Sequence, residues 1–331
     1  MKTRLMGAAG PAVSCLGVGA MSFAEFYGPT TEENSQAILH AALDAGVSHF
    51  DTANVYGMGR SEKAIGAFLK DTPDARDKMH IATKASITRR DGARVFDNSP
   101  EHLEAELDKS LMALGTDHVD LFYIHRREAE RPIEEVAETL AALVKKGKTR
   151  SIGFSEIAPS SLRRAHAVHP VAAVQSEYSL STRAPELGLL QACEELGVAF
   201  VAFSPVGRSL LTDTPLTGDV IANLPFLKAN PRFSPENLTQ NIALTAPFRA
   251  LAAEYGLPAA GLAIAWCIAK GEHVIPIPGT RSVAHFNELV AGANASLTPG
   301  DVARIEQVLP VGWAYGDRYS DDQWVGPERY C

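Results

Sequence analysis

Apolar residues along the chain gather in eight short continuous runs. The stretches between the runs are longer, and their apolar residues return every three or four positions, as they do on one face of a helix. A continuous apolar run predicts a strand buried on both faces, which is the environment of strands in a parallel sheet. We therefore expect eight parallel strands, at 16–20, 47–51, 80–84, 119–125, 150–155, 171–177, 198–204 and 273–279.

The intervening stretches predict helices. The clearest helix start follows Ser99, because a serine hydroxyl can accept a hydrogen bond from a free backbone amide. Pro100 suits the first turn, where the amide hydrogen that proline lacks would have no partner within the helix. Gly115 then suits a left-handed helix end. The expected helices run from Thr30 to Gly46, from Ser61, from Pro100, from Pro132, and over 159–168, 186–196, 237–255, 258–270 and 282–291.

Two stretches fall outside this alternation. The first residues predict a short hairpin that turns at 8–12, AAGPA, ahead of the first strand of the sheet. The stretch from Pro205 to Pro235 is rich in proline, and it is too irregular to form one helix or one strand.

Eight strand–helix units predict an α/β fold, a (β/α)8 TIM barrel, in which the initial hairpin closes the bottom. We expect residues 1–331 to form one domain. The rival fold is a doubly wound sheet that binds a dinucleotide, and it requires a G-x-G-x-x-G sequence after a strand. Both 17–19 (GVG) and 57–59 (GMG) lack the third glycine, so the barrel is favoured.

Composition narrows the class of protein. The chain has 331 residues, of which 46% are hydrophobic and 21% charged, as in ordinary globular domains. The net charge of -8 argues against nucleic acid or an anionic membrane as partner. No C-x-x-C pair occurs, so neither a zinc site nor a disulfide framework is expected for the four cysteines, Cys15, Cys193, Cys267 and Cys331.

The N-terminal sequence superficially resembles a secretory signal, because MKTR precedes an apolar stretch. That stretch is rich in glycine and alanine, contains Pro11 and Ser14, and lacks a leucine-rich core. No apolar run reaches the roughly 20 residues that a membrane-spanning helix needs. We therefore expect a cytoplasmic protein with reduced thiols.

The ends of the predicted strands carry polar residues that can support chemistry. In a barrel these ends meet at one rim, where barrel enzymes place their active sites. Each residue alone has an ordinary structural interpretation, such as a turn cap, a solvated lysine or a histidine at the edge of the core. Ordinary structural roles do not readily explain why so many polar residues converge on one rim. The residues at the strand ends are Asp51, Lys84, His125, Ser155, Gln175, Ser204 and Gly279.

Four residues of this region suggest proton transfer to an oxygen atom. Tyr56 lies in the loop after Asp51, and a tyrosine with a pKa near ~10 is protonated at neutral pH. A neighbouring Lys84 cation would lower that pKa, Asp51 would hold Lys84 in place, and His125 would orient a substrate carbonyl. No side chain supplies electrons, so the site requires a hydride from a cofactor.

Six sequence blocks in this order resemble the aldo-keto reductase family. They are FDTANVYGMGRSE (50–62), ALGTDHVDLFYIH (113–125), GFSE (153–156), QSEYS (175–179), AFSPVGRSLLT (202–212) and IPIPGTRS (275–282). The resemblance implies a barrel with extended cofactor and C-terminal loops that binds NADPH without a Rossmann fold. It also implies a catalytic tetrad made of Asp51, Tyr56, Lys84 and His125. The pair Ser155-Glu156 resembles a subset of long-chain members near the pyridoxal reductases.

The resemblance also implies cofactor contacts. Ser155 and Gln175 would bind the nicotinamide carboxamide, and Phe203 would stack on the ring in place of the usual tyrosine. The residues implied at the pyrophosphate are Ser204, Val206 and Arg208, and those implied at the adenosine 2′-phosphate are Gly279, Thr280 and Arg281.

Three positions depart from the family pattern. Glu156 replaces an asparagine beside the carboxamide, where a carboxylate can accept from the amide but cannot donate. His285 stands where an arginine often binds the 2′-phosphate, and a histidine is largely neutral at pH 7. Leu289 replaces an asparagine that commonly binds adenine. Because Arg281 is present, we expect NADPH/NADP+, with NADH as the alternative.

The expected activity is NADPH-dependent reduction of an aldehyde or activated ketone, a small-molecule carbonyl substrate. The sequence does not determine the oligomeric state, and a monomer is favoured. One alternative is a nucleotide-sensing binding subunit of the same fold with little turnover. A second is a metal-dependent barrel hydrolase that uses His49, Asp51 and His125, but the usual H-x-H pair is absent. The individual carbonyl substrate cannot be derived from the sequence. The aromatic residues placed by position near the barrel mouth are Phe23, Phe26, Trp313, Tyr315 and Trp324.

Overall fold

The computed structural model describes residues 1–330. The eight expected strands form one parallel sheet in the order β12-β11-β10-β9-β8-β5-β4-β3. Their bounds are β3 Gly17–Gly19, β4 His49–Asp51, β5 His80–Ala85, β8 Val119–Ile124, β9 Thr149–Ser155, β10 Val171–Glu177, β11 Ala199–Phe203 and β12 Val274–Pro276.

The sheet curls until its two ends meet. The Gly19 amide donates to the Pro278 carbonyl at 2.9 Å, which joins β3 to the segment that follows β12. A Cβ at Gly19 would lie 2.5 Å from the Ile277 carbonyl oxygen, so only glycine permits this approach. The prediction of a (β/α)8 barrel is therefore confirmed.

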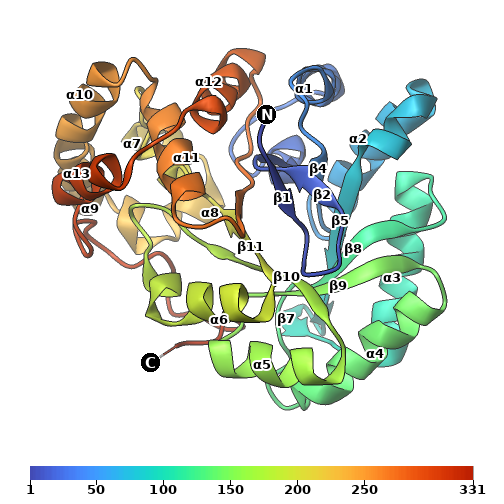
Figure 1. The fold of residues 1–331 in the computed structure, drawn as a ribbon. Coiled ribbons are helices and arrows are strands. Elements are labelled where there is room, and N and C mark those ends of the chain that lie inside the picture. Colours follow the sequence, from blue (N-terminus) through green and yellow to red (C-terminus); the bar gives the residue numbers. More distant parts are fainter. Residues whose placement is uncertain (331) are drawn as a thin grey trace.

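Helices surround the strands on the outside (Figure 1). The Ser99 hydroxyl accepts from the His102 amide at 3.4 Å, and Gly115 ends the same helix with a φ of 66°, as the sequence predicted. The main helices are α1 Glu32–Asp44, α2 Arg60–Asp71, α3 Pro100–Leu114, α4 Ile133–Lys145, α5 Pro159–Val168, α6 Leu189–Leu196, α11 Ala259–Ala269, α12 Val283–Asn294 and α13 Pro299–Val308.

The N-terminal hairpin closes one end of the barrel. Strands β1 Thr3–Leu5 and β2 Ala12–Ser14 pair antiparallel. Met6 and Val13 enter a cluster inside the barrel that contains Leu121 and Val201. A larger core lies between the strands and the surrounding helices. The predicted plug at the bottom of the barrel is therefore confirmed.

The expected single helix over 237–255 is wrong. The chain forms α9 Pro235–Leu244 and α10 Ala246–Glu254, which are separated at Thr245. Pro247 lies in the first turn of α10. Because proline has no amide hydrogen, the hydrogen bonds of α9 cannot continue through it.

The proline-rich stretch contains only short helices. These are η4 Gly207–Ser209, α7 Gly218–Ile221, α8 Pro225–Lys228 and η5 Pro231–Phe233. Three further 3-10 turns, also absent from the sequence prediction, are η1 Ala20–Ala24, η2 Pro73–Lys78 and η3 Ala184–Leu187. The stretch is thus irregular as a whole, as expected.

A second hairpin follows β5 and was not predicted. Its strands are β6 Ile87–Arg90 and β7 Ala93–Phe96. Asp91 and Gly92 join them with φ values of 52° and 80°. Positive φ at both central residues is typical of a type I′ turn, for which Asp-Gly is a favoured sequence. The Asp-Gly pair was therefore the signal for this hairpin.

Cys15, Cys193 and Cys267 are buried and free, and Cys331 lies outside the described residues. Within residues 1–330, no single helix has the length and apolar character to cross a membrane. The pair Pro235–Glu254 and Ala259–Ala269 passes that test together, but it bends by 84°.

Candidate active site

The predicted tetrad converges at the carboxyl ends of neighbouring strands. Asp51 ends β4, Lys84 lies near the end of β5, and His125 follows β8 directly. The Lys84 ammonium pairs with Asp51 and lies 3.5 Å from the Tyr56 hydroxyl. The rings of Tyr56 and His125 meet edge to face, with centroids 5.7 Å apart. The structure therefore brings all four residues together.

Lys84 is fixed from several sides. Its ammonium donates to the Thr52 carbonyl at 2.7 Å, while the second oxygen of Asp51 accepts from the Gln175 amide at 2.7 Å. Burial raises the pKa of Asp51 and lowers the pKa of Lys84, whereas the attraction between the two charges opposes both shifts. Asp51 therefore serves as a support for the lysine.

The expectation that a neighbouring cation lowers the pKa of Tyr56 overall is wrong, because its pKa is raised. Burial raises the pKa of Tyr56, and the Asp51 carboxylate raises it further. The Arg126 cation lowers this pKa, but not enough to reverse the rise. Tyr56 is therefore fully protonated at neutral pH and keeps a proton to donate.

His125 is a neutral imidazole. Burial lowers its pKa well below the ordinary value, and the cations of Arg126 and Lys84 lower it further. Its Nδ1 has no hydrogen-bond partner among residues 1–330. A neutral ring that faces Tyr56 can bind a carbonyl oxygen without adding a charge to the site.

A cavity of about 1430 Å³ opens over the tetrad. Small-molecule pockets usually have volumes of about 300–1,000 Å³, so this one has room for a cofactor and a substrate together. Besides the tetrad residues Asp51, Tyr56 and His125, it is lined by most of the predicted cofactor contacts: Ser155, Gln175, Phe203, Ser204, Val206, Arg208, Gly279, Thr280, Arg281 and His285.

Glu156 is the exception and requires a correction. Its side chain is 1% exposed and is not among the residues that line the cavity. The carboxylate pairs with the Arg318 guanidinium and accepts from the Glu177 amide at 2.8 Å. The backbone explains this direction, because Glu156 has a φ of 57°. The predicted contact of Glu156 with the nicotinamide carboxamide is therefore wrong.

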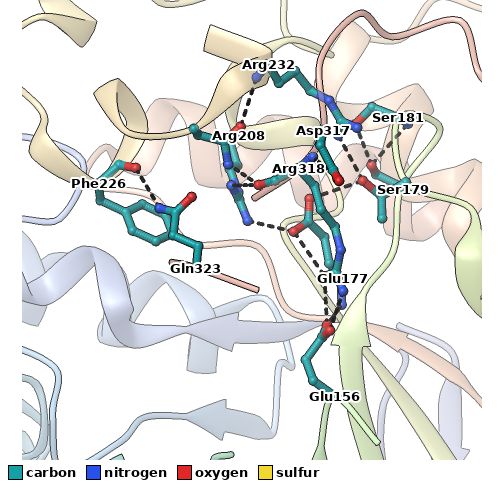
Figure 2. Close-up of polar contacts among 12 residues, drawn as sticks. Glu156, Glu177, Ser179, Ser181, Arg208, Phe226, Arg232, Asp317, Arg318 and Gln323 are labelled. Carbon is teal, nitrogen blue, oxygen red and sulfur yellow. Dashed lines mark hydrogen bonds and ion pairs between the residues drawn. The ribbon is translucent and has the colours of Figure 1, made fainter. Parts of the chain in front are cut away.

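Figure 2 shows the buried ionic cluster that Glu156 joins. Glu177 accepts from Arg208 at 2.6 Å, and Arg318 lies between Glu177 and Glu156. Arg208 also donates to the Arg318 carbonyl at 3.1 Å. The cluster ties the C-terminal segment, residues 309–330, to the strand ends and to the loop after β11. The sequence offered no signal for Arg318.

The aromatic lining differs from the sequence prediction. Of the five residues placed by position, only Phe26 lines the cavity. Phe23 belongs to the core, and the Trp313 indole donates to the Leu180 carbonyl. The aromatic residues that line the cavity and were missed are Tyr27, Phe96, Phe226 and Tyr319.

The metal-site alternative finds no support. No group of three candidate ligands occurs within residues 1–330. His49 instead faces His80, with 3.1 Å between the two Nδ1 atoms. Burial lowers the pKa of both rings, which describes a neutral histidine pair inside the barrel.

Comparison with protein families agrees with this geometry. Residues 15–310 match the model described as the aldo/keto reductase family. The chain belongs to the aldo-keto reductase family.

Two relatives match nearly the whole chain. A probable aldo-keto reductase 1 from Glycine max is 37% identical over 316 residues, which are 95% of this chain and 90% of that protein. The aldo-keto reductase yakc [NADP(+)] from Schizosaccharomyces pombe is 35% identical over 312 residues, with coverages of 93% and 92%.

Solved structures share the fold. The glycerol dehydrogenase AKR11B4 from Gluconobacter oxydans superposes with a TM-score of 0.81 at 27% identity, covering 93% of this chain and 94% of that one. The aldo-keto reductase AKR11C1 from Bacillus halodurans, in a holo form, gives 0.75 at 26% identity, with coverages of 98% and 99%. This aldo-keto reductase is therefore an oxidoreductase that acts on small carbonyl compounds with a nicotinamide cofactor.

Proposed function

We propose that this aldo-keto reductase uses NADPH to reduce an aldehyde or an activated ketone, and that Tyr56 donates the proton. The observation that carries the proposal is the Tyr56 hydroxyl, which lies 3.5 Å from the Lys84 ammonium beside His125 at the floor of the cavity. A protonated tyrosine, an adjacent cation and a neutral imidazole are suited to an oxygen that gains negative charge.

The residues along the cavity fit a nicotinamide dinucleotide. Ser204, Arg208 and Ser209 have φ values of 52°, 52° and 87°. Arg208 and Ser209 are consecutive, and turn conformations of this kind can point neighbouring amides toward an anion. The Nε of Arg208 is buried without a partner among residues 1–330. These groups, with Val206, would hold the pyrophosphate.

The two ends of the cofactor have separate candidates. Ser155 and the side-chain oxygen of Gln175 would bind the carboxamide, and Phe203 would stack on the ring. At the other end Arg281 lines the cavity and has no carboxylate partner within residues 1–330, so it would bind the 2′-phosphate with Gly279, Thr280 and His285. The relative named as NADP(+)-dependent supports the same cofactor.

When bound, the nicotinamide supplies a hydride. The side chains would then perform the proton chemistry. His125 would hold the carbonyl oxygen next to the Tyr56 hydroxyl, which gives up its proton as that oxygen becomes an alkoxide. Lys84 would stabilise the tyrosinate left behind, and Asp51 would keep Lys84 in position.

A panel of carbonyl compounds tests this function. We expect loss of NADPH absorbance with benzaldehyde, 4-nitrobenzaldehyde and a vicinal diketone. NADH should give at least about tenfold lower kcat/KM, because it lacks the phosphate that a cationic site binds. Tight binding of NADPH without turnover would favour the nucleotide-sensing subunit instead. Faster turnover with NADH would overturn the cofactor assignment.

A further inference from the structure

Arg126 follows His125 directly and lines the same cavity. Its backbone is fixed on both sides, because its amide donates to the Ser86 hydroxyl at 2.9 Å and its carbonyl accepts from Asn98 at 3.2 Å. One terminal nitrogen, Nη1, donates to the His125 carbonyl at 2.6 Å and to the Ser155 hydroxyl at 3.0 Å. The guanidinium is therefore anchored beside the reacting groups.

The other two nitrogens of the Arg126 guanidinium have no hydrogen-bond partner in the part of the chain that the structure describes. Nε and Nη2 of Arg126 make no hydrogen bond to residues 1–330, and no carboxylate of those residues pairs with this arginine. Arginine presents its N–H groups in a planar fork that matches the two oxygens of a carboxylate. A half-buried, unpaired fork in a cavity is thus ready to bind an anion.

Further arginines reinforce this end of the cavity. Arg89 and Arg94, from the β6–β7 hairpin, line it and have no carboxylate partner within residues 1–330. Burial and the Arg126 cation lower the pKa of Arg94, while Asp322 and Tyr319 raise it. The positive charges of Arg94 and Arg126 are therefore close enough to interact.

No acidic side chain of the hairpin or the C-terminal segment lines the cavity. Of the lining carboxylates, Asp51 pairs with Lys84 and Glu106 pairs with Lys109. Glu156 lies close enough for Arg126 to lower its pKa, but its carboxylate is bound by Arg318. The remaining lining acids come from other elements: Glu62, Asp213 and Glu288.

We propose that Arg126 determines substrate specificity by binding a carboxylate group on the carbonyl substrate, which makes aldehyde or keto acids the preferred substrate class. The proposal rests on the proposed function, since it places the carbonyl between Tyr56 and His125. Because Arg126 and His125 are adjacent and line the same cavity, one small molecule could place its carbonyl group at His125 and its carboxylate at Arg126. Arg89 and Arg94 attract that anion toward the cavity, although the protein as a whole has a net charge of -8.

Two aldehydes of similar shape test the proposal. The substrates are 4-carboxybenzaldehyde, which is anionic, and methyl 4-formylbenzoate, which is neutral, and the quantity measured is the ratio of their kcat/KM values with NADPH. We expect the wild type to prefer the anion. Arg126→Met should lower the ratio at least about tenfold, since a charge-assisted bidentate contact is lost. Arg126→Lys, which keeps the charge but not the fork, should give an intermediate ratio.

Arg163→Met is the matched control, because Arg163 lies on α5 and pairs with Glu195 at the surface. It should leave the ratio unchanged. If Arg126 acts only on the pKa of Tyr56 or on the position of Ser155, both aldehydes will slow equally or NADPH affinity will fall, with an unchanged ratio; either result overturns the inference. In that case turnover of the neutral ester still supports the proposed function. No turnover of either aldehyde by the wild type would overturn both.

Discussion

At the scale of single residues, the site depends on how charge surrounds Tyr56. The tyrosine is buried between one carboxylate, Asp51, and two cations, Lys84 and Arg126. Burial and Asp51 raise its pKa, so the proton stays on the oxygen at neutral pH; in the proposed reaction it would leave only when an alkoxide forms beside it. In the proposed reaction Lys84 would stabilise the tyrosinate that forms, although the resting state of Tyr56 is the protonated phenol.

This electrostatic balance predicts the pH dependence of reduction. The proposed donor, Tyr56, must be protonated, and its pKa in the folded protein lies above the ordinary value of ~10. The kcat for reduction should therefore stay constant from about pH 7 to about pH 9 and fall only above ~10. The measurement is kcat at saturating NADPH and aldehyde across this range. A decline that begins below pH 8 would show that Tyr56 is more acidic than the structure indicates.

At the scale of elements, the C-terminal segment is attached to the barrel through charge. Arg318 pairs with Glu156 after β9 and with Glu177 at the end of β10. Glu328 donates its amide to the Glu156 carbonyl and pairs with Arg127. The same segment supplies Tyr319, Gln323 and Val325 to the cavity. The buried pairs therefore hold part of the cavity lining in place.

Removal of one buried partner should loosen this segment. Glu156→Gln leaves the buried Arg318 with only its longer pair to Glu177, at 3.5 Å, and loss of one partner of a buried pair costs about 3 kcal/mol. The unfolding midpoint in urea should fall, and proteases should cleave within residues 309–330 sooner than in the wild type.

Glu254→Gln provides the matched control. Glu254 pairs with Arg304 at the surface, where both side chains are more than half exposed. Such a pair contributes at most about 1 kcal/mol. Equal losses of stability in the two variants would show that the Glu156 pair does not anchor the segment.

At the scale of the whole molecule, features made by residues close together in the sequence could be predicted. Contacts between residues far apart in the sequence could not. The barrel strands are local apolar runs, and the tetrad lies at or just after their ends, so both could be predicted. The helix break at Thr245 and the β6–β7 hairpin also have local signals in the sequence, Pro247 and Asp91-Gly92. The pair Glu156–Arg318 joins residues separated by 162 positions. No local pattern indicates such a contact, and the family resemblance alone places Glu156 beside the cofactor.

The central claim is that Tyr56 donates the proton, and single-turnover reduction of methyl 4-formylbenzoate by bound NADPH tests it most directly. Tyr56→Phe should slow this step at least about 100-fold with little change in NADPH affinity. Tyr315→Phe, at an exposed tyrosine outside the cavity lining, should react like the wild type. A Tyr56→Phe enzyme that reduces the aldehyde within about tenfold of the wild-type rate would contradict the account.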